Sequence, residues 1–480
     1  MRSVNQTLEK RTLLRIILVS LLSITYFISA RAQDNSPYSR YGLGDAHPGT
    51  NIFNRGMGGI SIGYSEQPIE SLDDRRNGKY YPTLNFSNPA SYSRFYAIKE
   101  ANSKKLSYGR MLLDVGINFD KHTLREVNRP NSFTSSNGYF SYLQLGVPLK
   151  KNLGLVFGLR PLSTISYKID RNELLIDPDS GNPIDSAKTQ FAGDGGSYLF
   201  NTGAGIAIKN LSIGVNAGYL FGKKDYSTRR FILNDTVDYA SSNHQTKSVF
   251  GGIFFNAGLQ YRIDLNKDKT KYLQIGAFGN IQHSLDGRSD IIRETFFQNA
   301  DGEYIRLDSV TEKLDIRGTV IYPSSFGAGF IAEQLPDVNK GGWLFGMDFI
   351  STNWDNYRFF GQQDAVNNNW QLKIGGQIRP RIKNSYKSLL AYRAGFYFGD
   401  DYLHINDQKL PVYGITAGLS LPIANLKDAS SRFRSQKSVV NISAEYIKRG
   451  NNDNPIKENI FRLSVGFTLS DLWFTKRKYE

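Results

Sequence analysis

The sequence predicts an all-β protein: a transmembrane antiparallel β-barrel of about fourteen strands behind an N-terminal hatch or plug segment. Three observations predict it. Runs of alternating apolar residues recur from about residue 110 to the C-terminus. Short and long breaks alternate between the first eight runs. The composition, with 45 Gly, 28 Tyr and 30 Phe among 480 residues, is typical of many strands with an aromatic lipid-facing band.

The first 32 residues have the pattern of a secretory signal peptide. A basic start precedes the apolar stretch from Leu13 to Ile28, and Ala30-Arg31-Ala32 supplies a small-x-small cleavage motif. We therefore expect the mature chain to begin at Gln33; an uncleaved membrane anchor is the alternative. Because the chain has no cysteine, we expect neither disulfide bonds nor an N-terminal lipoprotein anchor.

The net charge of +15 does not by itself indicate nucleic-acid binding, because Lys and Arg are scattered through predicted turns and loops. Behind a secretory signal, such residues are better placed to contact anionic lipid headgroups or periplasmic proteins. We expect a bacterial outer-membrane location. The expected partners are outer-membrane lipids, the outer-membrane assembly machinery and secretion-system proteins, and no nucleic acid.

Each predicted strand has one apolar and one polar or small face. In the last run, Phe461, Leu463, Val465, Phe467 and Leu469 alternate with other residues, as a strand requires. A helix would need apolar spacings of three and four, which these runs do not keep. The predicted strands contain residues 113–119, 143–149, 153–159, 197–208, 211–221, 255–263, 273–281, 326–330, 343–349, 370–378, 392–398, 413–421, 440–446 and 461–469.

The breaks between strands indicate which ends of the barrel they occupy. Breaks after the second, fourth and sixth strands are short, whereas those after the first, third, fifth and seventh are long, and we expect residues 283–318 to form the longest loop. Outer-membrane barrels with periplasmic termini have short turns on one side and long loops on the other. We therefore expect a barrel over residues 106–475 and a basic tail over 476–480. A soluble propeller or jelly roll is the rival interpretation, with shorter strands and similar loop sets.

Residues 33–105 resist strand assignment and are expected to form the hatch or plug; a periplasmic tail is the alternative. They contain Arg55-Gly56-Met57-Gly58-Gly59 and Asn88-Pro89-Ala90. Glycine clusters permit close backbone packing and positive φ, and Asn-Pro favours a turn. A lumen enclosed by about fourteen strands is wide enough to need filling.

The RGMGG stretch, the later NPA element and the barrel together resemble the FadL/TodX-type outer-membrane hydrophobic-compound transporters (OMPP1-like). The opening SPYSRYGLGD and the close GFTLSDLWFTKRKYE are similar to an outer-membrane family within this group. The resemblance implies that Arg55, Gly56, Gly58, Gly59, Asn88, Pro89 and Ala90 belong to a hatch. It also implies passage of fatty-acid-like hydrophobic small molecules across the outer membrane. The group includes a type IX secretion shuttle barrel, so a non-conducting subunit or shuttle of a secretion or assembly machine is the alternative.

Pro161 falls inside the third predicted strand. Proline cannot donate a ladder hydrogen bond, so it predicts a bulge, a kink or a strand end. In the resembled transporters an inward kink of this strand opens the wall laterally. The resemblance therefore implies a lateral window at Gly158, Pro161 and Ser163; a strand that ends at its loop is the alternative.

The sequence contains no pattern typical of catalysis, so we expect no enzyme activity, metal or cofactor. The five histidines are far apart, and there is no nucleophile elbow, phosphate loop or paired-carboxylate framework. Residues 177–185 weakly resemble a calcium loop. They lack its final glutamate and contain two prolines, so an ordinary surface turn is the preferred interpretation.

The functional alternatives predict different interiors. Passage of a hydrophobic molecule predicts an apolar pocket between hatch and wall. A barrel subunit or shuttle predicts a polar, tightly packed lumen and large protein partners. A diffusive porin would need an open charged channel, which a plug of this length opposes.

Overall fold

The computed structural model describes the residues given at the end of this paragraph. The predicted signal peptide and the basic tail lie outside them. No helix in the described part of the chain is long and apolar enough to cross a membrane. The described residues are 36–65, 82–99, 106–127, 132–176, 179–181, 183–233, 240–299, 303–337, 339–381, 386–405, 408–423 and 437–473.

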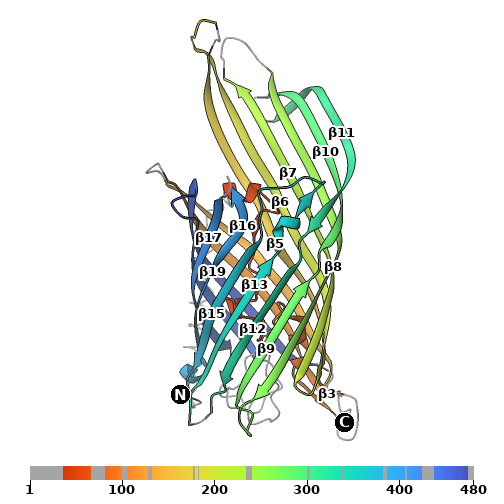
Figure 1. Ribbon diagram of the computed structural model, residues 1–480, viewed down its shortest axis with the longest axis vertical. Coiled ribbons are helices and arrows are strands. Elements are labelled where there is room, and N and C mark those ends of the chain that lie inside the picture. Colours follow the sequence, from red (N-terminus) through yellow and green to blue (C-terminus); the bar gives the residue numbers. More distant parts are fainter. Residues whose placement is uncertain are drawn as a thin grey trace, which may run out of the picture.

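Fourteen antiparallel strands of the described chain form a closed ring, which confirms the predicted fold class and strand number (Figure 1). The ring closes between its first and last strands, with Gly109 opposite Trp473 and Glu126 opposite Ile456. The strands, in order round the ring, are β3 (Leu106–Glu126), β4 (Ser132–Lys150), β5 (Leu153–Ile176), β6 (Pro183–Ile208), β7 (Leu211–Ile232), β8 (Ser241–Asp264), β9 (Lys271–Asn280), β12 (Ser325–Gln334), β13 (Gly342–Thr352), β15 (Asn369–Arg379), β16 (Ala391–Ile405), β17 (Gln408–Ile423), β18 (Lys437–Arg449) and β19 (Ile456–Trp473).

The ring has an apolar outer surface and a polar inner surface. In β19, Phe461 and Phe467 are exposed on the outside, whereas Arg462, Ser464 and Thr468 are buried inside. A closed antiparallel barrel with an apolar outer face leaves no unpaired strand edge in lipid. This is the architecture of a bacterial outer-membrane barrel.

Strands β5 to β8 continue beyond the ring on one side (Figure 1). There they join β10 (His283–Gln298) and β11 (Tyr304–Tyr322), which pair as a hairpin. β8 pairs with β9 in its second half and with β10 in its first half. We call the fourteen-stranded ring the belt and the taller sheet β5-β6-β7-β8-β10-β11 above it the extension.

The predicted loop over residues 283–318 is therefore wrong, because these residues form the β10–β11 hairpin. The physical reason lies in the outward side chains. In the belt β7 points Tyr219 outward to lipid, whereas above the belt it points the charged Lys223 and Asp225 outward. The strand period persists, but charged side chains also occupy the outer face there, so the regular hydrophobic alternation is lost.

The orientation of the barrel follows from its connections. The tight turns 150–153 and 208–211 lie at the end of the ring where β3 begins and β19 ends. Outer-membrane barrels place short turns and termini in the periplasm, so the extension stands on the extracellular side.

The N-terminal residues 36–65 and 82–99, here called the inner segment, lie within the ring (Figure 1). Most of their side chains are buried. The short elements of the inner segment are η1 (Pro37–Arg40), β1 (Asp45–Ala46), α2 (Ile52–Arg55), η2 (Pro89–Arg94) and β2 (Ala97–Lys99). Three further short elements lie in connections between strands: η3 (Trp354–Asn356), β14 (Arg358–Phe359) and η4 (Tyr386–Leu389).

Candidate functional site

The helix α2 fixes the inner segment to the first two barrel strands through Arg55. Asn51 caps the helix by accepting a hydrogen bond from the Asn54 backbone N–H at 3.0 Å. The buried Arg55 guanidinium donates to Asn118 Oδ1 on β3 and to Ser141 Oγ on β4, both at 2.7 Å. It also donates to the Thr50 carbonyl at 3.0 Å. Arg55 thus fastens the helix to the wall with several directed bonds.

The glycines after Arg55 let the chain run closely along β15 to β17, further round the wall. A Cβ on Gly56 would lie 2.8 Å from Gly418 Cα on β17. Gly58 has φ +73°, and its N–H donates to Thr416 Oγ1 at 2.8 Å. Gly59 has φ +79° and passes the Lys373 side chain on β15. Close approach and positive φ both require glycine here.

The Asn88-Pro89-Ala90 element ties the inner segment to the middle of the wall. Asn88 Nδ2 donates to the Ile62 carbonyl at 2.8 Å and to the carbonyls of Leu259 on β8 and Ala277 on β9 at 3.3 and 3.2 Å. Asn88 Oδ1 accepts the Ala90 N–H, which caps η2. Pro89 and Ala90 lie against Gly214 on β7, where any side chain would collide with them.

Three wall residues that sequence reasoning did not single out complete this attachment. The buried Asp348 carboxylate on β13 accepts the N–H groups of Ser61 at 2.6 Å and Ile62 at 2.9 Å. Gln260 donates to the Ile62 carbonyl, and Gln274 donates to Gln260 and to Ser65 Oγ. The sequence shows these as inward polar positions of strands. It does not show which of them face the inner segment.

A buried charge network joins the inner segment to the wall near the extracellular rim. Arg449 on β18 pairs with Asp45 of the inner segment at 2.7 Å, Asp401 on β16 at 2.9 Å and Glu458 on β19 at 3.1 Å. Glu458 also pairs with His122 on β3 at 2.7 Å. Asp45 is the contribution of the inner segment to this network, and the other partners of Arg449 belong to the wall.

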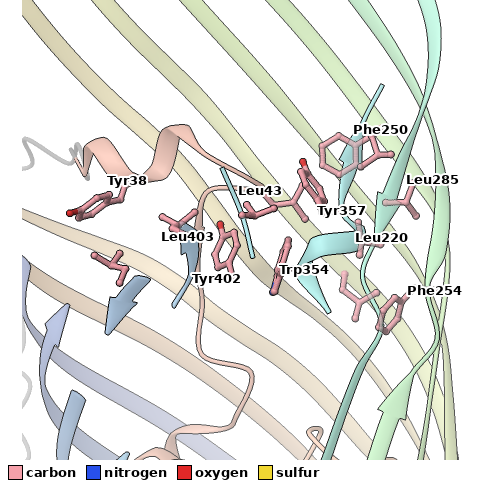
Figure 2. Close-up of a cluster of buried hydrophobic side chains, with 14 residues drawn as sticks. Tyr38, Leu43, Leu220, Phe250, Phe254, Leu285, Trp354, Tyr357, Tyr402 and Leu403 are labelled. Atoms are coloured by element: carbon pink, nitrogen blue, oxygen red, sulfur yellow. The ribbon is translucent and has the colours of Figure 1, made fainter. Parts of the chain in front are cut away.

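An apolar cluster lies across the top of the lumen (Figure 2). Leu43 of the inner segment lies between Tyr402 on β16 and Tyr357 in the connection after β13. Trp354 stacks on Tyr402 with ring centroids 4.2 Å apart. The wall contributes Leu220, Phe250, Phe254 and Leu285 to the same cluster. These contacts cover the lumen where the extension begins.

The residues of the predicted window lie together on β5, in contact with the inner segment. The β5–β6 register shifts between Pro161 and Ser163, so the proline sits at a bulge, one of the predicted possibilities. The described β4–β5 ladder ends at Leu159, and above it β1 pairs with β5 at Ser163 and Thr164. Gly158 lies against the Gln144 side chain. The Ser163 hydroxyl donates to the Leu43 carbonyl at 2.6 Å.

The space between inner segment and wall includes a cavity with a mixed lining. This cavity of about 400 Å³ is bordered by charged residues, among them Arg55, Arg160 and Glu445, and by apolar ones such as Phe254 and Ile350. A pocket for an apolar ligand is predominantly hydrophobic with a few polar groups, so the buried charges set this lining apart from such a pocket.

His47 of the inner segment faces this cavity. Its Nε2 lies 2.7 Å from Thr164 Oγ1, and its ring centroid is 4.5 Å from that of Tyr139. Burial, and then the positive charge of Arg462, lower the pKa of His47 to about 3. The imidazole is therefore neutral at physiological pH.

The calcium-loop interpretation of residues 177–185 stays untested, because positions 177, 178 and 182 lie outside the described residues. Within the described residues, no group of three or more His, Asp or Glu side chains is placed to hold a metal ion.

The sequence matches the model of one protein family, BamG, over residues 13–480. The chain belongs to the BamG family. No curated protein matches the sequence.

Solved structures similar to this chain are outer-membrane barrels. They include the CymD monoaromatic hydrocarbon channel, at 14% identity and a TM-score of 0.45 over 89% of this chain and 98% of that one. A Pseudomonas aeruginosa FadL homologue matches at 12% identity and 0.45, with the same coverage. The P. putida toluene transporter TodX matches at 13% identity and 0.46 over 88% of this chain and 98% of that one. The barrel architecture that the resemblance implies is confirmed by the closed ring of strands itself. What those proteins carry does not determine what this chain does.

Proposed function

We propose that this chain is a sealed outer-membrane barrel that acts through protein partners, as a subunit or shuttle of a secretion or assembly machine. One observation carries the proposal: the inner segment is bonded to opposite sides of the ring at once. Arg55 is bound to β3 and β4, Gly58 to β17, and Asn88 to β8 and β9. A segment bonded to several separate parts of the ring acts as a permanent filling rather than a moving gate.

The chemistry of the lumen supports the same conclusion. Buried charges inside the ring are paired, as Arg449 is with Asp45 and Arg462 is with Asp120. Breaking a buried pair costs about 3–5 kcal/mol. The cavity of about 400 Å³ has charged as well as apolar groups in its walls, so it is not specialised for an apolar solute.

The proposal is tested by conductance and by native purification. In planar bilayers we expect the wild-type barrel to remain closed. The variant Arg55→Ala/Asn88→Ala, which unfastens the inner segment, should open measurable conductance, while Arg317→Ala on the extension should leave the barrel closed. Purification from native outer membranes in mild detergent should yield a complex larger than the barrel alone. A conducting wild-type barrel, or a monomer with a stoichiometric bound lipid, would overturn the proposal.

A second candidate, the lateral passage of a small apolar molecule, is favoured by one feature of the wall. The β4–β5 ladder ends at Leu159 just before the bulge at Pro161, and the lumen cavity reaches Arg160 there. If this gap is a route, Pro161→Val should reduce uptake of a long-chain fatty acid by cells, whereas Leu159→Val should not. Equal uptake by both variants and wild type would remove this candidate.

A further inference from the structure

The last strand of the extension, β11, has one side without a partner strand. β10 pairs with β11 along its length. On the other side, β14 pairs only with Val320 and Ile321, and the Phe360 N–H donates to the Thr319 carbonyl. Within the described residues, no strand pairs with this side of β11 over 304–318. These fifteen or so residues present free backbone groups to the aqueous phase.

Three exposed aliphatic side chains lie along this strand. The β10–β11 register shifts three times, and at each shift β11 has unpaired extra residues that include one aliphatic: Leu307, Val310 and Leu314. Their side chains are 54%, 69% and 60% exposed. They lie above the lipid-facing belt, so lipid does not cover them. A row of exposed aliphatic residues in water marks an interaction surface.

Most of the charges around these residues have partners within the extension. Arg306 pairs with Glu294 at 3.2 Å and with Glu312 at 2.9 Å. Asp315 pairs with Arg288 at 3.4 Å and Arg317 at 3.8 Å. What the edge offers to a ligand is therefore backbone hydrogen bonding and apolar contact, which is the chemistry that recognises an extended polypeptide.

The other edge of the extension shows how such an edge is covered in this molecule. On β5, above the end of the β4–β5 ladder, β1 adds to the edge as an antiparallel strand at Ser163 and Thr164. Ser39 continues the contact, since its hydroxyl and the Ser166 backbone exchange hydrogen bonds at 3.2 Å. The chain thus supplies a covering segment for the edge of β5. At β11 it covers only the base of the edge, with the two residues of β14.

We infer that residues 304–318 of β11 bind an extended segment of a different protein, added as an antiparallel strand on the extracellular side, with its apolar side chains against Leu307, Val310 and Leu314. This inference rests on the proposed function, because it names the surface through which a partner is held. β14 already begins an antiparallel ladder at the base of this edge, so the backbone there is competent for strand addition. The three bulges restrict which segment fits and thereby limit non-specific pairing.

A second copy of this chain is a poor occupant of the edge. Two copies in one membrane carry β11 in the same direction, from its start at Tyr304 toward its base at β14, so their free edges could meet only in parallel. Parallel pairing would not continue the antiparallel ladder that β14 begins at this edge. The geometry therefore favours a separate partner segment, whose direction is free.

The test compares two edge variants in the full-length protein, purified from native outer membranes in mild detergent. The first, Leu307→Lys/Val310→Lys/Leu314→Lys, alters the free edge of β11. The matched control, Leu174→Lys/Ile176→Lys, alters exposed aliphatics at the tip of β5, which are 67% and 59% exposed. Complex size is measured by light scattering, and amide hydrogen exchange of residues 304–318 is compared between the complex and the isolated barrel. Heat-modifiable migration in gels checks that each variant folds.

We expect the β11 substitutions to reduce the amount of complex by about tenfold or more, and the control substitutions to leave that amount unchanged. Amides of residues 304–318 should exchange at least about tenfold more slowly in the complex, since strand addition gives them partners. A complex that survives the β11 substitutions, or β11 amides that are unprotected in it, overturns this inference and leaves the proposed function standing. A homodimer through β11 also overturns it. A wild-type protein with no complex at all overturns the proposed function and this inference together.

Discussion

The belt and the extension share strands β5 to β8, but different contacts hold them together. In the belt, β7 points Tyr219 to lipid, and its inner face meets η2 of the inner segment at Gly214. In the extension, the same strand holds an exposed ion pair between Lys223 and Asp194 of β6, at 2.5 Å. The belt depends on buried polar bonds to the inner segment, and the extension depends on its own cross-strand pairs.

This difference indicates which contacts contribute most to the stability of the molecule. Buried hydrogen bonds have large penalties when one partner is removed, whereas exposed ion pairs contribute little. Substitutions where the inner segment meets the belt should therefore lower the free energy of unfolding strongly. Matched substitutions on the extension should leave it almost unchanged.

The largest contrast is expected at Asp348. Asp348→Ala leaves the buried N–H groups of Ser61 and Ile62 without an acceptor, so we expect a loss of about 2–5 kcal/mol and faster proteolysis of the inner segment. The control Asp194→Ala removes an exposed partner of Lys223 and should change nothing measurable. Unfolding in denaturant, followed by heat-modifiable migration, measures both. Equal stability of the two variants would abolish the contrast between belt and extension.

A smaller effect is expected from crowding the contact at Asn88. In Gly258→Ala the new methyl group collides with Asn88 Oδ1, and we expect about 1–3 kcal/mol of destabilisation. Gly49→Ala is the matched control, because its methyl group would meet only Arg160 Nη1 at an ordinary 3.6 Å. The same unfolding assay compares the two variants. An unchanged free energy of unfolding in Gly258→Ala would show that the inner segment can shift to make room for the methyl group.

Lys224 lies where belt and extension meet, so its substitution tests which contacts stabilise their junction. Its buried ammonium donates to Tyr357 Oη at 3.0 Å and lies 4.1 Å from the centre of the Phe359 ring. Lys224→Met keeps the apolar volume and loses these contacts, so we expect about 1–2 kcal/mol of destabilisation. Lys223→Met, one residue away and exposed, should be silent. A silent Lys224→Met would mean that the junction is held by packing alone.

The smallest effect is a pH dependence at His47. Its folded pKa lies below the ordinary value of 6.5, so the neutral form is favoured by folding. The stabilisation that neutral His47 gives to the folded state is complete above pH 6.5 and is lost as pH falls from 6.5 toward 3. Between pH 7.5 and 5 we expect wild type to lose about 1–2 °C more in Tm than His47→Gln. Identical pH profiles would show that the cavity admits enough water to protonate His47 freely.

Hydrophobic alternation predicted all fourteen strands of the ring, because lipid outside and polar contacts inside impose opposite chemistry on successive residues. It did not predict the hairpin at 283–318 or the full length of β5 to β8, where water lies on both faces. Motif reasoning singled out Arg55, Gly58 and Asn88, each of which the structure places in contact with the wall. It missed Asp348 and Arg449, because their partners depend on which strands face each other across the ring.

The inner segment contacts wall strands that lie far apart in the sequence. This separation bears on the order in which the barrel assembles. Arg55 can meet Asn118 and Ser141 as soon as the first hairpin exists, fewer than ninety residues along the chain. Gly58 must wait for Thr416, 358 residues later, and closure waits for β19 to reach β3. Contacts this distant in sequence form slowly. We therefore expect the inner segment to dock on the early strands first and to become the filling of the barrel only when the ring closes.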